Sequence, residues 1–283
     1  MKKKYLFLLL LIPFITFSQE DLLEDLENDA VVDKSVTSTF EGLKIINIES
    51  TKVAGKGDFY FLIAHRFGSI KDGVKELFGL DGATIKFSFF YGITDKLQLG
   101  AARSEFRKTY DLNAKYKIAK QVTDGFPFTI TNFSSIGIDT NLDKDILPGL
   151  EFENRLTYLS ELLISRKFND ELSLQIAPIF IHENLVKNSN QDNSQFALAL
   201  AGSYQISKSI SITGEFVPHF NRISNSDFKD VVSLGIDWEV GGHIFQLMLT
   251  NSQQLNDTHY VTNATGDWSD GDIYFGFNLY RVF

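Results

Sequence analysis

Histidine and carboxylate side chains are the residues of this 283-residue chain whose chemistry is recognised most directly. The five histidines lie far apart in the sequence, and none forms a pair at a spacing that metal ligands use. They are His65, His182, His219, His243 and His259. The chain has no cysteine, which excludes disulfides, thiolate metal sites and thiol nucleophiles. The sequence therefore predicts neither a metal site nor a bound cofactor.

One stretch, "HRFGS" at 65–69, places a histidine close to a serine, which is a pairing that nucleophilic hydrolases use. The neighbouring residues do not match a known nucleophile motif, and the chain has no GxSxG elbow. Ser69 is more consistent with the start of a loop. We therefore expect no enzyme activity and no catalytic residues, and a lipid-acting enzyme is the least favoured of three functional hypotheses.

Charged side chains recur at alternate positions within several short segments. The candidates are Lys86, Asp111, Lys115, Lys117, Glu161, Glu215, Asp237 and Glu239. The carboxylates are of the type that performs acid–base chemistry, but carboxylates and lysines that share one face also pair with each other in a hydrated interior. We favour the second interpretation, in which these side chains face a polar lumen.

The elements that would position these charges are strands, because large apolar residues recur at every second position from residue 57 onward. Twelve segments show the pattern: 57–68, 83–93, 96–106, 107–119, 126–139, 155–168, 171–183, 195–206, 209–219, 230–241, 243–252 and 272–283. Most have about ten residues, the length that crosses a bilayer when a strand is tilted. The alternation is weaker in 155–168, 171–183, 195–206, 209–219 and 243–251.

The connections between these segments alternate between short and long. "ITDK", "FNDE", "SKS" and "VGGH" are tight turns, whereas 69–82, 140–154, 184–194, 220–229 and 253–271 are longer. Short turns at one rim and long loops at the other are typical of outer-membrane barrels. The sequence thus predicts an all-β fold, a closed antiparallel transmembrane β-barrel of about twelve strands. Its apolar side chains would face the lipids of the outer membrane.

The N-terminal residues indicate secretion. Three lysines precede an apolar run of about thirteen residues, which predicts a signal peptide over 1–18 that is cleaved after Ser18. Residues 19–56 form a second unit before the barrel at 57–283. We expect this unit to be a short periplasmic segment, either helical or disordered, with an extra strand or a partial plug as alternatives. A net charge of −9 argues against nucleic acid as a partner.

The last strand, "DIYFGFNLYRVF", ends the chain on an aromatic residue. Phe275, Phe277, Leu279 and Phe283 resemble the C-terminal signal by which barrel-assembly machinery recognises its clients, although Arg281 departs from the usual aromatic at its position. "HRFG" (65–68), "FGLDG" (78–82), "YGITD" (91–95), "FQLMLTNSQ" (245–253) and "GDIYFGFN" (271–278) resemble an uncharacterised β-barrel family of Bacteroidetes, domain-of-unknown-function family 5777. The resemblance implies location and fold from about residue 40 onward, and it implies no activity.

Two hypotheses therefore lead. In the first, the protein is a passive pore or small-solute channel with a polar lumen of mixed charge. In the second, salt bridges or residues 19–56 seal the lumen, and the barrel is a scaffold or carries a binding surface on its loops. The sequence does not identify a solute, an oligomeric state or an extracellular partner.

Overall fold

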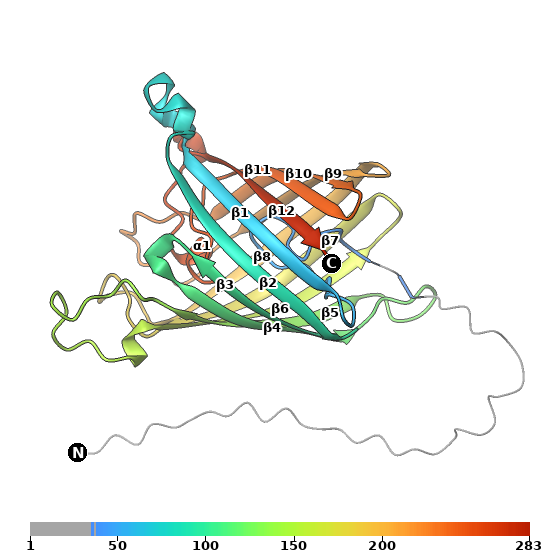
Figure 1. Ribbon diagram of the computed structural model, residues 1–283, viewed down its shortest axis with the longest axis horizontal. Helices are drawn as coiled ribbons and strands as arrows, with labels where there is room; N and C mark the ends of the chain where they lie inside the picture. Colours follow the sequence, from blue (N-terminus) through green and yellow to red (C-terminus); the bar gives the residue numbers. More distant parts are fainter. Residues whose placement is uncertain (1–34, 37) are drawn as a thin grey trace, which may run out of the picture. The chain divides into compact units, whose positions relative to one another are not determined.

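Segments in which polar and apolar residues alternate form a closed barrel of twelve antiparallel strands in the computed structural model, which describes residues 35, 36 and 38–283 (Figure 1). The strands are β1 (Phe59–Ser69), β2 (Ala83–Thr94), β3 (Leu97–Ser104), β4 (Tyr110–Ala119), β5 (Thr129–Ile138), β6 (Leu156–Lys167), β7 (Leu172–Glu183), β8 (Ser194–Ser207), β9 (Ile210–Val217), β10 (Val231–Val240), β11 (His243–Thr250) and β12 (Tyr274–Val282). The predicted fold class and strand number are confirmed, and no strand end differs by more than three residues. The predicted signal peptide lies outside the described residues.

Each strand pairs with its neighbours in sequence, and the first and last strands pair to close the barrel. The closing pair aligns Tyr60 with Val282 and Ile63 with Leu279. Phe59 and Phe283 exchange two backbone hydrogen bonds, with N···O distances of 3.3 and 2.9 Å. The terminal phenylalanine therefore completes the seam, which leaves the sheet without an open edge.

The connections sort by length as expected. The turns β2–β3, β6–β7, β8–β9 and β10–β11 are tight. In the last of these, Gly241 and Gly242 have φ angles of 55° and 77°, a conformation that glycine adopts at little cost. The short helices lie in the connections at the opposite end: η1 (Ile70–Asp72), η2 (Val74–Gly79), η3 (Phe106–Lys108), η4 (Glu153–Arg155), α1 (His259–Thr262) and η5 (Trp268–Asp270). None of the helices in the described part of the chain has the length and apolarity needed to cross a membrane.

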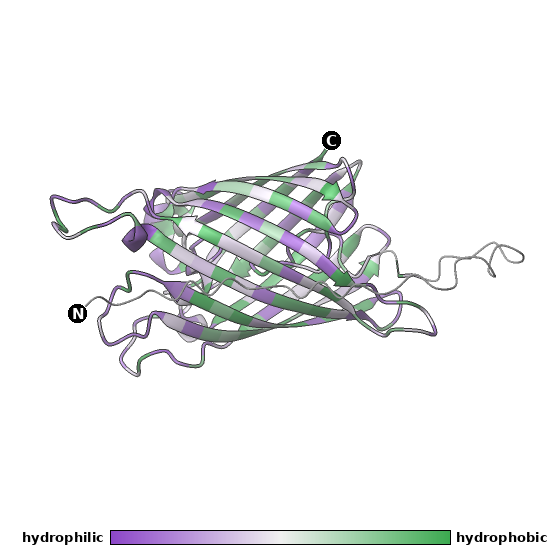
Figure 2. Cartoon of the chain, turned by 90° about the horizontal axis from the view of Figure 1, so that it is seen from below, coloured by the Kyte–Doolittle hydropathy of each residue, from purple (hydrophilic) through white to green (hydrophobic). Residues whose placement is uncertain are grey.

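The outer surface of the barrel is apolar. Along β10, for example, Leu234, Ile236 and Trp238 are about half exposed, whereas Ser233 and Asp237 at the intervening parity are buried. Hydrophobic and hydrophilic bands alternate along the strands in the same way (Figure 2). An exposed band of this kind on a closed barrel matches the lipid-facing surface of membrane barrels.

The inner surface is less uniformly polar than the sequence led us to expect. About half of the inward positions of β6, β7 and β8 are apolar, and they include Leu159, Leu163, Ile179, Ile181 and Ala199. Outward residues of these strands, such as Leu162, Ile176 and Phe196, are apolar as well. Apolar residues therefore occur on both faces in the middle of these strands, which accounts for the weak alternation in these three of the five weaker segments. The expectation of a polar, hydrated lumen is wrong for this part of the wall.

A nitroxide label tests which face meets lipid. In protein refolded into phospholipid vesicles, labels at Phe87→Cys and Leu234→Cys are expected to collide more often with oxygen than with an aqueous nickel chelate, because these positions face acyl chains. A label at Asn225→Cys, an exposed position in the β9–β10 connection, provides the aqueous control. Greater access to the nickel chelate at positions 87 and 234 would contradict the membrane orientation.

Candidate functional site

Residues 40–54 lie inside the barrel and are almost entirely buried. They form a tight hairpin, in which the N–H of Ile45 donates to the carbonyl of Ile48 and the N–H of Ser50 donates to that of Leu43, both at 2.9 Å. We call this segment the lumen hairpin. Residues 40–54 lie where a partial plug, one of the alternatives for residues 19–56, would be placed.

The lumen hairpin presents an apolar side to the apolar part of the wall. Ile45, Ile46 and Ile48 are at most 1% exposed and belong to one buried cluster with wall residues such as Phe133 and Leu163. Burying an isoleucine side chain contributes roughly 1.5–3 kcal/mol. The hairpin therefore supplies the apolar contacts that the inward residues of β6–β8 would otherwise lack.

A second segment enters the lumen from the long-connection end. Residues 251–264 of the β11–β12 connection, which contain α1, are mostly buried. We call them the lumen loop. The hydroxyl of Tyr260 donates to Oε1 of Glu161 at 3.1 Å, and Ser135 donates to Oδ2 of Asp257 at 2.9 Å. These contacts tie the loop to β5 and β6 near the hairpin.

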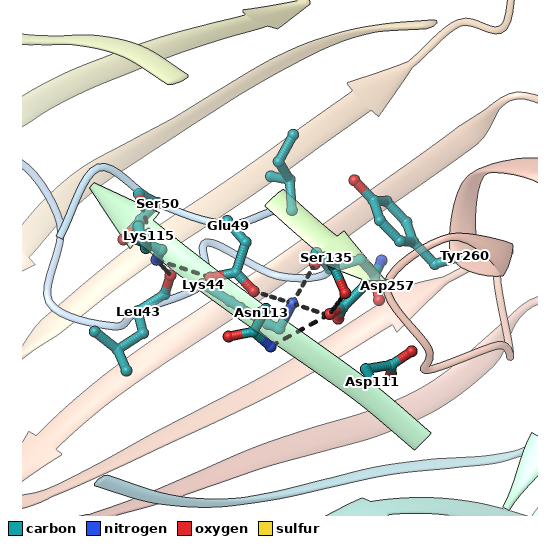
Figure 3. Close-up of polar contacts among 12 residues, drawn as sticks. Leu43, Lys44, Glu49, Ser50, Asp111, Asn113, Lys115, Ser135, Asp257 and Tyr260 are labelled. Atoms are coloured by element: carbon teal, nitrogen blue, oxygen red, sulfur yellow. Dashed lines mark hydrogen bonds and ion pairs between the residues drawn. The ribbon is translucent and has the colours of Figure 1, made fainter. Parts of the chain in front are cut away.

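Six buried charged residues join the hairpin, the loop and the wall. In order of contact they are Lys115, Glu49, Lys44, Asp257, Lys86 and Asp111. Five of them, all except Lys86, are labelled in Figure 3. Lys115 is 2.7 Å from Glu49, Lys86 is 2.7 Å from Asp257 and 2.8 Å from Asp111, and Lys44 contacts both Glu49 and Asp257. Three lysines and three carboxylates give the cluster no net formal charge. We call it the lumen ion chain.

Electrostatic attraction within the lumen ion chain opposes the penalty of burial. Burial alone raises the pKa of Asp257, but the charges of Lys86 and Lys44 outweigh it and lower the pKa to about 2. Asp257 is therefore a carboxylate at neutral pH. Lys115 also donates to three carbonyls of the hairpin segment, those of Leu43, Ser50 and Lys52, at 2.9–3.1 Å. These hydrogen bonds satisfy the ammonium group that burial has taken out of water.

The tip of the hairpin is bound by a second group of polar wall residues. Glu215 accepts hydrogen bonds from the backbone N–H groups of Asn47 and Ile48 at 3.0 and 3.2 Å. The Arg66 guanidinium donates to Oδ1 of Asn47 at 2.9 Å, and Gln246 donates to the carbonyl of Ile45 at 3.0 Å. The turn is therefore anchored by side chains from several strands, as a ligand would be.

The eight lumen candidates fall into two groups. Lys86, Asp111, Lys115, Glu161, Glu215 and Asp237 are at most 6% exposed. All six contact the hairpin, the lumen loop or a residue that does. Lys117 is only partly buried, and Glu239 is exposed beside the β10–β11 turn, so these two lie toward the short-turn rim.

Sequence reasoning missed the other polar residues of the lumen network, each of which contacts one of the six or another member of the network. They are Lys44, Asn47, Glu49, Arg66, Gln246, Asp257 and Asn278. A signal was present in "LKIINIES", where two charged residues and an asparagine interrupt an isoleucine-rich run. A charge inside such a run indicates a buried partner.

The C-terminal residues that resemble an assembly signal lie on the outer side of β12. Phe275 stacks on Phe67 with ring centroids 5.6 Å apart, and Phe283 is 68% exposed at the end of the seam. Phe277 and Leu279 follow the same outward alternation. Their accessibility fits a surface that other proteins recognise, and recognition itself remains a prediction.

The histidine and serine of "HRFGS" do not form a catalytic pair. His65 faces outward and stacks on Phe277 at 5.1 Å, whereas Ser69 caps η1 by accepting from the N–H of Lys71. A different pair does meet on the outer face, because Nδ1 of His182 lies 2.9 Å from Oγ of Ser194. Within the described hydrogen bonds, no carboxylate or amide holds the other ring nitrogen of His182, so the orienting group of a catalytic triad is missing there. In the same part of the chain, no group of three or more His, Asp or Glu side chains is arranged to hold a metal ion.

His219 lies near the long-connection end, where it is 8% exposed and contacts Gln195 through Nε2 at 2.8 Å. Burial, followed by the positive charge of Arg222, lowers the pKa of His219 to about 4, although Asp230 and Glu183 act in the opposite direction. The imidazole is therefore neutral at neutral pH.

Taken together, the fold and the site define a membrane β-barrel whose lumen is filled by an N-terminal hairpin and a returning loop. No curated protein sequence matches the chain. Solved structures with a similar chain path include the NanC porin, at 9% identity and a TM-score of 0.49 over 79% of this chain and 98% of that one. The KdgM porin is 9% identical, with a TM-score of 0.48 over 80% of this chain and 99% of that one. Outer membrane phospholipase A from Escherichia coli is 9% identical, with a TM-score of 0.42 over 82% of this chain and 94% of that one.

The particular family is established by sequence. The chain belongs to domain-of-unknown-function family 5777, described as a membrane bound beta barrel domain, which matches residues 40–283. This is the family that the sequence motifs resemble, so that prediction is confirmed. The match begins at Phe40, where the lumen hairpin begins. The hairpin is therefore part of the family domain.

Breaking the lumen ion chain at Lys115 is expected to release the hairpin. Lys115→Met leaves Glu49 with one of its two lysine partners and strips the donor from three carbonyls, so local stability should fall by about 3–5 kcal/mol. Hydrogen exchange of the amides in residues 40–54 measures this loss in refolded protein.

Two variants control this experiment. Glu49→Gln combined with Lys115→Met should lose less than the sum of the two single changes, because both members of the pair are then removed. Lys96→Met, at an exposed turn position, should leave exchange unchanged. Unchanged exchange in Lys115→Met would show that the ion chain does not hold the hairpin.

The pKa of His219 predicts a pH dependence of unfolding. Between pH 6.5 and 4 the unfolded chain takes up a proton on this imidazole that the folded chain does not, so the folded state loses stability as pH falls. Because His219→Gln removes this difference, the free energy of unfolding should decline less over that range in the variant than in the parent. Urea titrations at pH 7, 5.5 and 4 measure it, and parallel curves would refute the assignment.

Proposed function

We propose that this protein is an outer-membrane channel for small polar solutes that is closed at rest, and that the lumen hairpin and the lumen loop are its closure. One observation carries the proposal: the interior is filled by two segments that are not barrel strands and are held by side-chain contacts. An unobstructed passive pore does not describe this arrangement, since a cavity between Lys44, Arg66 and Tyr260 measures only about 10 Å³. That volume has room for about one water molecule.

The hairpin is built to separate from the wall without breaking the barrel. Its two described backbone–backbone hydrogen bonds are internal, and the described links between residues 40–54 and the strands involve a side chain on at least one side. Withdrawal would therefore leave every strand ladder intact. Glu49 and Asn47 would move away from Lys115 and Glu215 respectively, and water would replace them.

Charged contacts suit such a movement better than apolar contacts would. A buried ion pair contributes little net stability because desolvation offsets most of its attraction, so exchanging it for water is nearly balanced. The wall residues left behind, including Lys86, Asp111, Lys115, Glu161 and Glu215, would line a hydrated path of mixed charge with weak ion selectivity.

Outer-membrane location is part of this proposal. It is supported by the even strand number and by the sorting of short and long connections to opposite ends. We accordingly infer that the partners are outer-membrane lipids and, during biogenesis, the assembly machinery that would read the C-terminal strand.

A permanently closed scaffold is the second candidate. The observation that favours it is the neutral lumen ion chain, in which every charge already has a partner of opposite sign. In that case the long connections, and not the lumen, would carry the function.

A reversible tether distinguishes the two candidates. The hydroxyl oxygens of Thr51 in the hairpin segment and Ser165 in β6 are 2.6 Å apart, so Thr51→Cys with Ser165→Cys should form a disulfide. The parent chain has no cysteine to compete. If solutes pass where the hairpin sits, oxidation should reduce small-solute entry into proteoliposomes to the level of protein-free vesicles, and reduction should restore it.

Ser165→Cys alone, treated in the same way, controls for the oxidant. Equal entry in the oxidised and reduced states would exclude the hairpin as a gate. No entry through the parent, combined with clear entry through a chain that lacks residues 40–54, would favour the closed scaffold.

A further inference from the structure

A cavity of about 380 Å³ lies at the long-connection end of the barrel, separate from the lumen ion chain. Four parts of the chain line it: the β3–β4 connection, the β7–β8 connection with the adjoining strand ends, the β9–β10 connection, and the lumen loop at Thr262 and Asn263. The volume is in the range of small-molecule sites. We propose that this cavity binds a small anionic solute rich in hydroxyl groups.

Basic side chains outnumber acidic ones in the lining by one, although the whole chain is acidic. Arg107, Lys187 and Arg222 face two carboxylates, those of Glu183 and Asp227. Glu183 is already engaged, because its Oε2 lies 3.5 Å from Nε2 of His259 and its Oε1 accepts from Gln195 at 3.2 Å. The lining residues therefore carry one more positive than negative formal charge, whereas the chain has a net charge of −9. A cationic pocket concentrates anions.

Lys187 is the residue that would bind the anionic group. Among the ion pairs of the described residues it has no carboxylate partner, whereas Arg222 is 2.9 Å from Asp230 and Arg107 is 3.7 Å from Asp139. Its ammonium group lies 5.4 Å from the ring centroid of Phe228, which also lines the cavity. An available cation beside an aromatic face offers one contact for a carboxylate and another for the C–H face of a ring.

Amide and hydroxyl side chains supply the remaining contacts. Asn188, Asn225 and Asn263 each offer donors and acceptors, as Ser189 and Ser226 do. Gln191 is not free to adapt, because it donates to the carbonyl of Asn221 and accepts from the N–H of Ile223, which fixes one connection against the other. The asparagine and serine side chains can form hydrogen bonds with several hydroxyl groups of one ligand. A bare inorganic anion would use fewer of these contacts.

The cavity also contacts the closure. Nη2 of Arg222 donates to the carbonyl of Val261 at 3.3 Å, and the next two residues, Thr262 and Asn263, belong to the lining. A bound solute would thus touch the lumen loop at the outer mouth. As an entrance site the cavity rests on the channel function proposed above, but binding itself does not require passage.

Calorimetric titration of the detergent-solubilised full chain with sodium D-glucuronate tests the site. Saturable binding is expected, and Lys187→Glu should weaken it by about tenfold or more because a favourable charge contact becomes a repulsive one. Lys144→Glu makes the same charge change at an exposed position of the β5–β6 connection outside the cavity, and it should leave affinity unchanged. D-glucose, which lacks the carboxylate, should bind about tenfold or more weakly than D-glucuronate.

Two outcomes would overturn the proposal: no saturable binding of glucuronate, or equal affinities in Lys187→Glu and Lys144→Glu. Circular dichroism of both variants verifies that they remain folded. The oxidised Thr51→Cys/Ser165→Cys protein should still bind glucuronate, since the tether lies outside the cavity. If glucuronate binds but oxidation of the tether does not change solute entry, only the channel proposal is refuted. If oxidation blocks solute entry but glucuronate does not bind, only the proposed binding site is refuted.

Discussion

A twelve-stranded barrel encloses more space than the side chains of its own wall can fill, and this constraint governs the rest of the structure. Water is one solution, but the apolar residues among the inward positions of β6–β8 gain nothing from it. The protein instead fills the lumen with its own chain. The lumen hairpin places isoleucines against the apolar part of the wall, and Lys44, Asn47 and Glu49 make its polar contacts.

Polar burial on this scale requires nearly complete pairing. An isolated buried lysine would lose its charge or destabilise the fold, so each ammonium group of the lumen ion chain meets carboxylates or carbonyl oxygens. The partners come from three parts of the chain that are distant in sequence: the hairpin, the early strands and the lumen loop. The ion chain therefore also fixes where the two filling segments meet, since a shifted hairpin would leave Lys115 and Glu215 without partners.

The strands and their connections could be predicted from the sequence because they depend on local information. In β2 and β10, side chains alternate between lipid and lumen, and the period is visible within ten residues. The plug was not predictable in the same way. Glu49 pairs with Lys115, and Asn47 with Glu215, across separations that no local pattern records. The predicted polar lumen holds along β4, where Asp111, Asn113 and Lys115 are buried, and only in part along β6–β8, where apolar residues occur on both faces.

The lumen hairpin contacts apolar wall residues on one side and charged wall residues on the other, and this difference allows it to be both stably bound and movable. Apolar contacts between the isoleucines and the wall of β6–β8 are favourable only while water is excluded, whereas the charged contacts exchange with water at nearly balanced free energy. Hydration entering from the polar side would therefore separate Glu49 and Lys115 before it disturbs the isoleucine cluster. The apolar contacts then determine how strongly the hairpin binds again inside the lumen. The charged contacts determine where the hairpin first separates from the wall. A lumen filled only by apolar residues would have no such starting point.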